Sequence, residues 1–183
     1  SNAAQTIAQV IARTDDVLQR ERPDAVLILG DTNSCLGMIA AKRQKIPIFH
    51  MEAGNRCFDQ RVPEEINRKM VDHLSDINLV YTEHARRYLI AEGVRPDTII
   101  KTGSPMREVL DHYRSGIEMS QALSRMGLEP GQYFVVSAHR EENVDDPDTL
   151  RGLLASLNAL VLRFEKQIVF SCHPRTAERL SKL

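Results

Sequence analysis

Short apolar runs recur along the chain, and longer stretches of mixed polarity separate them. Runs of four or five residues that are almost continuously apolar predict strands covered on both faces, as in a parallel sheet. Polar residues follow each apolar run and mark the end of the expected strand. The expected strands span residues 25–29, 46–50, 77–81, 98–101, 133–136 and 167–171.

The stretches between these runs place apolar residues at helical spacing, as Ile7, Val10, Ile11 and Leu18 do near the start. Helices that alternate with strands predict an α/β fold with a doubly wound parallel sheet. The expected helices span residues 4–20, 34–44, 63–74, 83–92, 104–114, 119–126, 147–164 and 174–182.

The alternation breaks once, between residues 104 and 131, where two helical patterns follow each other and glycine and proline punctuate the chain. This break predicts a domain boundary, with residues 4–115 in a first domain and residues 116–183 in a second. The segment 104–116 is a candidate hinge between them.

The two ends of the sequence also bear on the prediction of domains. Residues 1–3, Ser-Asn-Ala, are similar to the remnant of a cleaved expression tag and are excluded from the fold prediction. The remaining chain starts and stops inside helical patterns. We therefore expect a piece of a longer protein.

Composition narrows the function classes. Lys and Arg number 24 against 25 Asp and Glu, a formal charge of −1, which provides no electrostatic attraction for nucleic acid or an anionic membrane. No apolar run approaches the roughly 18 residues of a spanning helix, which indicates a soluble, cytoplasmic protein. Cys35, Cys57 and Cys172 are widely spaced, so neither a disulfide framework nor a structural zinc site is predicted.

Two carboxylates follow the first two strands, where ligands bind in open parallel sheets. Asp31 lies in the string Gly30–Ser34 and is either a turn or helix-cap residue or a carboxylate at the ligand-binding edge. Glu52 comes directly behind a buried strand, a costly position unless it is exposed in a cleft or paired, for example with Arg56. His50, the last residue of that strand, is interpreted as a hydrogen-bonded structural histidine.

A third carboxylate, Glu64, opens the helix expected at 63–74. Pro63 suits the first helical turn, and acids there complement the positive end of the helix dipole. Glu64 and Arg68 also have the spacing of an ordinary helical ion pair. Glu64 acquires a chemical role only if it lies near Asp31 and Glu52 across the strand ends.

Basic residues follow the strands of the second half. His139 and Arg140 come after the fifth strand, where they bind a diphosphate and move a proton or else form a solvated loop. His173 follows the last strand at the start of a helix that can hold an anion. Asp146 and Asp148 imitate a metal-binding acidic pair, but a helix start with proline in its first turn is the favoured interpretation.

Five strings of residues go further than composition and periodicity. They are Gly30-Asp-Thr-Asn-Ser34, His50-Met-Glu-Ala-Gly-Asn-Arg56, Pro63-Glu-Glu-Ile-Asn-Arg68, Thr102-Gly-Ser-Pro105 and Ala138-His-Arg-Glu-Glu-Asn143. In order and approximate spacing the chain resembles the bacterial non-hydrolysing UDP-N-acetylglucosamine 2-epimerase family, over its whole length from about residue 4. The resemblance implies two Rossmann-like domains facing across a cleft, similar to the glycosyltransferase B architecture, with both domains incomplete here.

The resemblance also implies roles for individual residues. The catalytic set would be Asp31, Glu52, Glu64 and His139, and the substrate-binding set Arg56, Arg68, Arg140 and His173. The last two correspond to positions that border a second, regulatory UDP-sugar pocket in some bacterial members. The family scheme requires no metal and no cofactor, and it implies a homodimer of the full-length protein.

Two departures from the family pattern qualify these expectations. The string Met51–Asp59 differs from the Val-Glu-Ala-Gly-Leu-Arg of the plain N-acetylglucosamine enzymes and is more similar to the branch that makes unusual amino sugars for capsule or O-antigen. Family members also carry an upstream basic loop and a downstream Ser-Gly-Gly loop that hold the nucleotide sugar. Without them the chain alone is expected to be inactive.

The implied reaction inverts C2 of the sugar by expelling UDP from C1 while the C2 proton is removed, and UDP later returns to the glycal. One group must accept a proton on one face and a second must deliver one on the opposite face. We expect Glu52 and Glu64 to handle the protons, Asp31 to orient the sugar or share their proton, and His139 to offset charge at the diphosphate.

Two alternatives stay open at this point. One is a nucleotide-sugar-dependent glycosyltransferase of the same architecture, and the other is a nucleotide-sugar-binding fragment without catalysis. An NAD-linked Rossmann enzyme is set aside, because no Gly-x-Gly-x-x-Gly string follows any expected strand.

Overall fold

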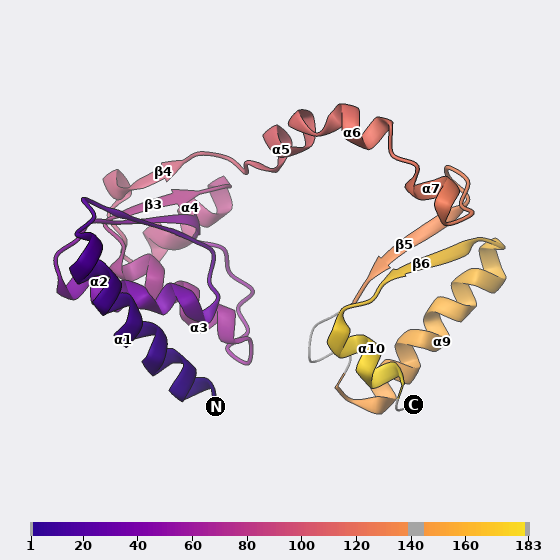
Figure 1. Ribbon diagram of the computed structural model, residues 1–183, viewed down its shortest axis with the longest axis horizontal. Helices are drawn as coiled ribbons and strands as arrows, with labels where there is room; N and C mark the ends of the chain where they lie inside the picture. Colours follow the sequence, from indigo (N-terminus) through magenta and orange to yellow (C-terminus); the bar gives the residue numbers. More distant parts are fainter. Residues whose placement is uncertain (1, 139–144, 182–183) are drawn as a thin grey trace. The chain divides into compact units, whose positions relative to one another are not determined.

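The computed structural model describes residues 2–138 and 145–181. The chain divides into two compact units, residues 1–111 and 112–183, each with helices beside its own parallel strands (Figure 1). The α/β class and the parallel pairing predicted from the hydrophobic pattern are therefore confirmed. The division falls inside the segment 104–116, which stays a candidate hinge, and the boundary expected at residue 115 stays a prediction.

The first unit is built on a four-stranded sheet in the order β1-β2-β3-β4, with every neighbouring pair parallel. Its strands are β1 (Val26–Leu29), β2 (Ile48–Ala53), β3 (Ile77–Val80) and β4 (Ile99–Lys101). Each begins within two residues of its predicted start. Because the strands are parallel, their carboxyl ends lie along one edge of the sheet.

Helices connect these strands. They are α1 (Ala3–Glu21), the 3-10 helix η1 (Asn33–Gly37), α2 (Met38–Arg43), α3 (Pro63–Leu74), α4 (Glu83–Ala91), the 3-10 helix η2 (Pro96–Thr98) and α5 (Met106–His112). The single helix expected at 34–44 is wrong in its first turn, which is the tighter η1. This turn passes close to α1, since a Cβ on Gly37 would lie only 2.5 Å from Thr14 Oγ1.

Two helix starts of the first unit follow the general capping rules. Asn2 and Gln5 cap α1 reciprocally, each side chain bonded to the other residue's backbone N–H. Pro63 occupies the first turn of α3, with Glu64 and Glu65 beside it. The start of α3 is thus set locally, and this places the residues of its first two turns along the strand ends.

Two apolar clusters hold the first unit together. The larger one joins α1, η1 and α2 to the sheet and includes Leu18, Met38, Ile48 and Val71. The smaller one packs α4 against β3 and β4 around Leu89. Fully burying side chains of this size stabilises a fold by about 1.5 to 3 kcal/mol each, so these clusters make a large contribution to the stability of the first unit.

Burial alternates along several strands. In β1 the side chains of Leu27 and Leu29 are 62% and 66% exposed, and in β5 (Tyr133–Ser137) Val135 is 68% exposed. The expectation that these strands are covered on both faces is therefore wrong for this chain. Among the described residues, one face of each of these strands therefore carries exposed apolar side chains.

The second unit contains β5 paired in parallel with β6 (Gln167–Ser171), in register from Tyr133 opposite Gln167 to Ser137 opposite Ser171. In the part of this unit that the structure describes, the helices are α6 (Arg114–Glu118), α7 (Ala122–Arg125), α9 (Pro147–Phe164) and α10 (Pro174–Leu180). The helix expected at 119–126 begins three residues later than predicted. Asp146 caps α9 by accepting a bond from the Thr149 N–H, which agrees with a helix start at this position.

Candidate active site

The carboxyl edge of the first sheet carries the acidic residues singled out from the sequence. Asp31 is the second residue after β1, and Glu52 is the fifth residue of β2. Tyr81 follows β3 at the same edge. Three neighbouring strands thus present two carboxylates and a phenol side by side, although only the carboxylates were singled out from the sequence.

Glu52 lies in a distorted part of β2. The pairing with β3 shifts between Met51 and Ala53, and Glu52 has φ +66°, in the left-handed region. The expectation that the strand ends at His50 and that Glu52 follows it is therefore wrong. A bulge redirects the side chain of the residue at its centre, which turns Glu52 towards the Asp31 turn. A Cβ on Gly30 would lie 3.9 Å from Glu52 Oε2.

Arg68 of α3 joins the two carboxylates. One guanidinium nitrogen lies 2.6 Å from Asp31 Oδ2 and 3.1 Å from Glu52 Oε1, and the Arg68 side chain is 14% exposed. The simple alternatives, a Glu52–Arg56 pair and a Glu64–Arg68 helical pair, are not the pairs that form among the described residues. Arg68 instead neutralises part of the charge that the strand ends bring together.

Glu64 acts on this pair through its charge. Burial raises the pKa of Asp31; the Arg68 cation opposes this shift, and the carboxylates of Glu52 and Glu64 add to it. Burial and the Glu52 charge likewise raise the pKa of Tyr81. Asp31, Glu52 and Glu64 therefore form one electrostatic cluster, in which Arg68 pairs with Asp31 and Glu52 and the pKa of Asp31 is raised.

Asn67, next to Arg68 on α3, fixes the backbone of the Asp31 turn. Its side-chain amide donates to the Asp31 carbonyl at 2.9 Å and to Asn33 Oδ1 at 3.0 Å, and the residue is 5% exposed. The string Pro63–Arg68 thus supplies a nearby acid, a backbone clamp and a counter-ion from consecutive turns of one helix. Asn67 was missed from the sequence, and its place in that string is the signal that could have found it.

Arg56 does not join the carboxylate cluster. Its guanidinium is fully buried in this chain and bonds Asp72 at 2.7 Å and both oxygens of Glu92 at 2.6 and 2.8 Å. Burial lowers the pKa of Arg56, but its bonds to Glu92 and Asp72 outweigh that effect and raise it. Among the described residues Arg56 therefore belongs to a buried ion network behind the strand ends, and the substrate-binding role expected of it stays a prediction.

Comparison with known proteins identifies the family. The model of the UDP-N-acetylglucosamine 2-epimerase family matches residues 1–183. The chain belongs to this epimerase family. A UDP-N-acetylglucosamine 2-epimerase of Methanocaldococcus jannaschii is 33% identical over 181 residues, which cover 95% of this chain and 49% of the relative.

Other family members extend the comparison. A UDP-2,3-diacetamido-2,3-dideoxy-D-glucuronate 2-epimerase of Pseudomonas aeruginosa is 36% identical over 184 residues, covering 98% of this chain and 50% of the relative. The solved structure of UDP-N-acetylglucosamine 2-epimerase from Rickettsia bellii superposes with a TM-score of 0.93 at 56% identity, over all of this chain and 48% of that one. The chain spans about half the length of the relatives it matches.

A second solved structure of the family carries ligands. The Methanocaldococcus jannaschii UDP-GlcNAc 2-epimerase in complex with UDP-GlcNAc and UDP has a TM-score of 0.88 at 31% identity, and the match covers 100% of this chain and 51% of that one. The family resemblance stated from the five strings is confirmed by these comparisons.

The remaining predicted site residues belong to the second unit. His139 and Arg140 lie outside the described residues. His173 is exposed between β6 and α10. The roles proposed for these three residues in this epimerase-family chain stay predictions.

Among the described residues, no helix combines the length and apolar character needed to cross a membrane.

Proposed function

We propose that the full-length protein containing this chain is a UDP-N-acetylglucosamine 2-epimerase, or an epimerase of a closely related UDP-amino sugar. The observation that carries the proposal is the cluster at the carboxyl edge of the first sheet. There Asp31 and Glu52 share the Arg68 guanidinium, and the Glu64 charge reaches the same pair. Inversion at C2 requires such paired acid and base groups.

In this proposal Glu52 and Glu64 exchange the C2 proton, one as base and one as acid. Loss of the proton from C2 breaks the C1–O bond to UDP and leaves a glycal and UDP, and re-addition of UDP with proton delivery to the opposite face gives the inverted sugar. Asp31, whose pKa is raised, shares a proton with these groups or orients the sugar. His139 and Arg140 bind the diphosphate, and His173 contributes to the nucleotide-sugar site of the second unit.

The test is incorporation of solvent hydrogen. The full-length protein would be incubated in heavy water with UDP-N-acetylglucosamine and, separately, with UDP-2,3-diacetamido-2,3-dideoxy-D-glucuronate, and each sugar examined by proton NMR. We expect deuterium at C2 in the product and in recovered substrate. Absence of C2 deuterium from both sugars would contradict the proposal, and sugar transfer to an added acceptor would favour the glycosyltransferase alternative.

A pair of variants shows whether the measured C2 exchange comes from this protein or from a contaminating enzyme. Glu52→Gln keeps the size and hydrogen-bonding capacity of the side chain but removes its basicity, so C2 exchange should fall by roughly 10² to 10⁴. Glu21→Gln, at an exposed position at the end of α1, ahead of the first residue of β1 and not at a strand end, is the control and should leave exchange unchanged.

The finer assignments complete the proposal. The Met51–Asp59 string and the 36% identity to the diacetamido-glucuronate enzyme support a UDP-amino sugar of the kind used in capsule or O-antigen synthesis. We also propose that the full-length protein acts in the cytoplasm as a homodimer without a metal or cofactor. Size-exclusion chromatography with light scattering would test the dimer.

A further inference from the structure

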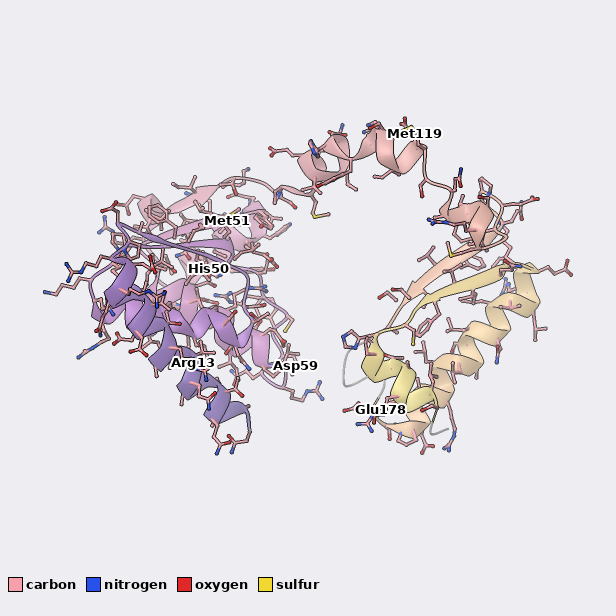
Figure 2. All side chains as sticks on the ribbon, in the orientation of Figure 1. Arg13, His50, Met51, Asp59, Met119 and Glu178 are labelled. Carbon is pink, nitrogen blue, oxygen red and sulfur yellow. The ribbon has the colours of Figure 1, made fainter. Side chains whose placement is uncertain are left out.

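A pair of buried polar side chains lies directly behind the carboxylate cluster and takes no part in the chemistry proposed above. His50, on β2 (Figure 2), and Asp72, on α3, are both fully buried. His50 Nδ1 lies 2.8 Å from Asp72 Oδ1. Burying two such groups is costly unless every polar atom has a partner, so the bonds they make explain their presence.

The imidazole reaches the Asp31 turn. His50 Nε2 lies 3.0 Å from the carbonyl oxygen of Gly30, the residue directly before Asp31. A carbonyl oxygen only accepts, so Nε2 carries a proton and donates it. Gly30 has φ +76°, a conformation that glycine adopts without strain, and the bond holds this turn in place.

The carboxylate reaches the Glu52 bulge. Both oxygens of Asp72 accept from the backbone N–H of Gly54 at 3.2 Å, two residues after Glu52. Asp72 also binds the Arg56 guanidinium at 2.7 Å, which compensates its charge. The buried pair is therefore bonded at one end to the backbone beside Asp31 and at the other end to the backbone beside Glu52.

We propose that His50 and Asp72 are positioning residues for the epimerase reaction, which hold the Asp31 turn and the Glu52 bulge in fixed register through the Gly30 carbonyl and the Gly54 amide. The proposal rests on the function proposed above. Both carboxylates sit on turns whose direction depends on backbone conformation. A displacement of about 1 Å at reacting groups lowers rates by roughly 100-fold, so a rigid connection between the two turns has a direct catalytic consequence.

The first test is kinetic and uses the full-length protein. His50→Phe retains a ring of similar size but removes both bonds, and His50→Gln restores a donor towards Gly30 alone. We expect kcat for C2 exchange to fall by about 10- to 100-fold in His50→Phe, with KM changed by less than about threefold, and to recover partly in His50→Gln. If His50→Phe fails to fold, His50→Gln is measured alone, and its kcat should still be lower than that of the wild type.

The control is Val71→Ala. Val71 is fully buried on α3 next to Asp72, but it belongs to the apolar core and contacts neither turn through a hydrogen bond. This variant should lower Tm while leaving kcat per folded molecule unchanged. If the His50 variants behave in the same way, with a lower Tm and a wild-type kcat, their role is structural and the proposal is overturned.

A second readout does not depend on the activity. In the 183-residue chain, the backbone amide NMR signals of Asp31 and Gly54 should shift in His50→Phe and His50→Gln and stay in place in Val71→Ala. If the wild-type full-length protein exchanges no deuterium at C2, the proposed function fails, and the amide shifts still report on the connection. Unchanged Asp31 and Gly54 signals in both His50 variants would overturn the positioning proposal by themselves.

Discussion

The Arg68 guanidinium lies 2.6 Å from the Asp31 carboxylate, and the same nitrogen is 3.1 Å from Glu52. One cation from a helix thus holds together two acids from different strand ends. Glu64 adds a third negative charge within electrostatic range. After burial, the Arg68 cation therefore has the largest effect on the pKa of Asp31.

Removal of the Arg68 charge should shift the pH dependence of activity. The cation lowers the pKa of Asp31, so Arg68→Met raises that pKa further. If turnover needs ionised Asp31, the acidic limb of kcat/KM for C2 exchange moves to higher pH in the full-length variant. Arg68→Lys keeps a charge without the two-armed guanidinium and should give a smaller shift. An acidic limb that stays in place in Arg68→Met would show that Arg68 does not control Asp31.

Asp31→Asn should lose activity and gain stability. The pKa of Asp31 is raised chiefly by burial, so folding favours its protonated form. The ionised carboxylate then costs stability above its folded pKa, and this cost disappears below its unfolded pKa near 3.8. We expect C2 exchange to fall by roughly 10² or more and the free energy of unfolding in urea to rise at neutral pH but not at acidic pH. A loss of stability at neutral pH would mean that the Arg68 pair outweighs burial.

Arg56→Met should destabilise the fold. The substitution leaves Asp72 buried without its guanidinium partner, and breaking a buried pair in this way costs about 3 to 5 kcal/mol. Urea denaturation of the 183-residue chain measures the loss. Arg61→Met, at an exposed guanidinium, is the matched control and should change stability by less than about 0.5 kcal/mol. Normal stability combined with a raised KM in the full-length Arg56 variant would instead support the substrate-binding role.

Gly54→Ala should be much more harmful than Gly93→Ala. Both glycines have positive φ, +75° and +91°, so alanine is strained at each by about 1 to 2 kcal/mol. At Gly54 the added Cβ would also lie 2.6 Å from the Ala85 carbonyl oxygen, whereas nothing lies within 4 Å at Gly93. Chemical denaturation should give a loss on the order of 3 kcal/mol at Gly54, where overpacking adds to strain. Equal losses at the two positions would contradict the close approach of β2 to α4.

The three cysteines should differ in reactivity. Cys35 is buried, and burial is the main cause that raises the pKa of its thiol to about 11. Cys57 and Cys172 are exposed. Because the thiolate is the reactive form, iodoacetamide at mildly alkaline pH should modify Cys57 and Cys172 well before Cys35, as followed by mass spectrometry. Early modification of Cys35 in folded protein would show that its cluster opens readily.

Much of the fold follows from local sequence signals. The apolar runs place the strands because a buried parallel strand leaves few positions for polar residues. Pro63 and Asp146 mark the starts of α3 and α9, since caps and first-turn prolines act within one turn of the helix. Asp31 and Glu52 could be placed near each other because the carboxyl ends of parallel strands share an edge of the sheet.

The pairing of charges could not be predicted in the same way. Spacing in sequence suggested Arg56 for Glu52 and Arg68 for Glu64, but α3 turns Arg68 towards Asp31 and the strand ends place Arg56 beside Asp72 and Glu92. These partners depend on how elements pack. His50 was interpreted as a structural histidine, but only the three-dimensional structure connects it to Gly30 and Asp72.

The exposed sheet positions were mispredicted for a different reason. An apolar residue in the sequence indicates that its side chain is suited to burial, but it does not indicate which element covers that side chain. Leu27 and Leu29 read as core residues, yet they are more than half exposed in this chain. Since the chain spans about half the length of its relatives, apolar patterning alone cannot separate an internal face from one that another segment would cover.

The left-handed backbone at Glu52 has a cost and a use. A residue other than glycine in this conformation loses on the order of 1 to 3 kcal/mol, and glycine would avoid the loss at once. The fold thus tolerates a locally unfavourable conformation at the position where the carboxylate is aimed at the Asp31 turn. Selection for heat resistance alone would favour glycine at this position, and that gain in stability would remove the acid.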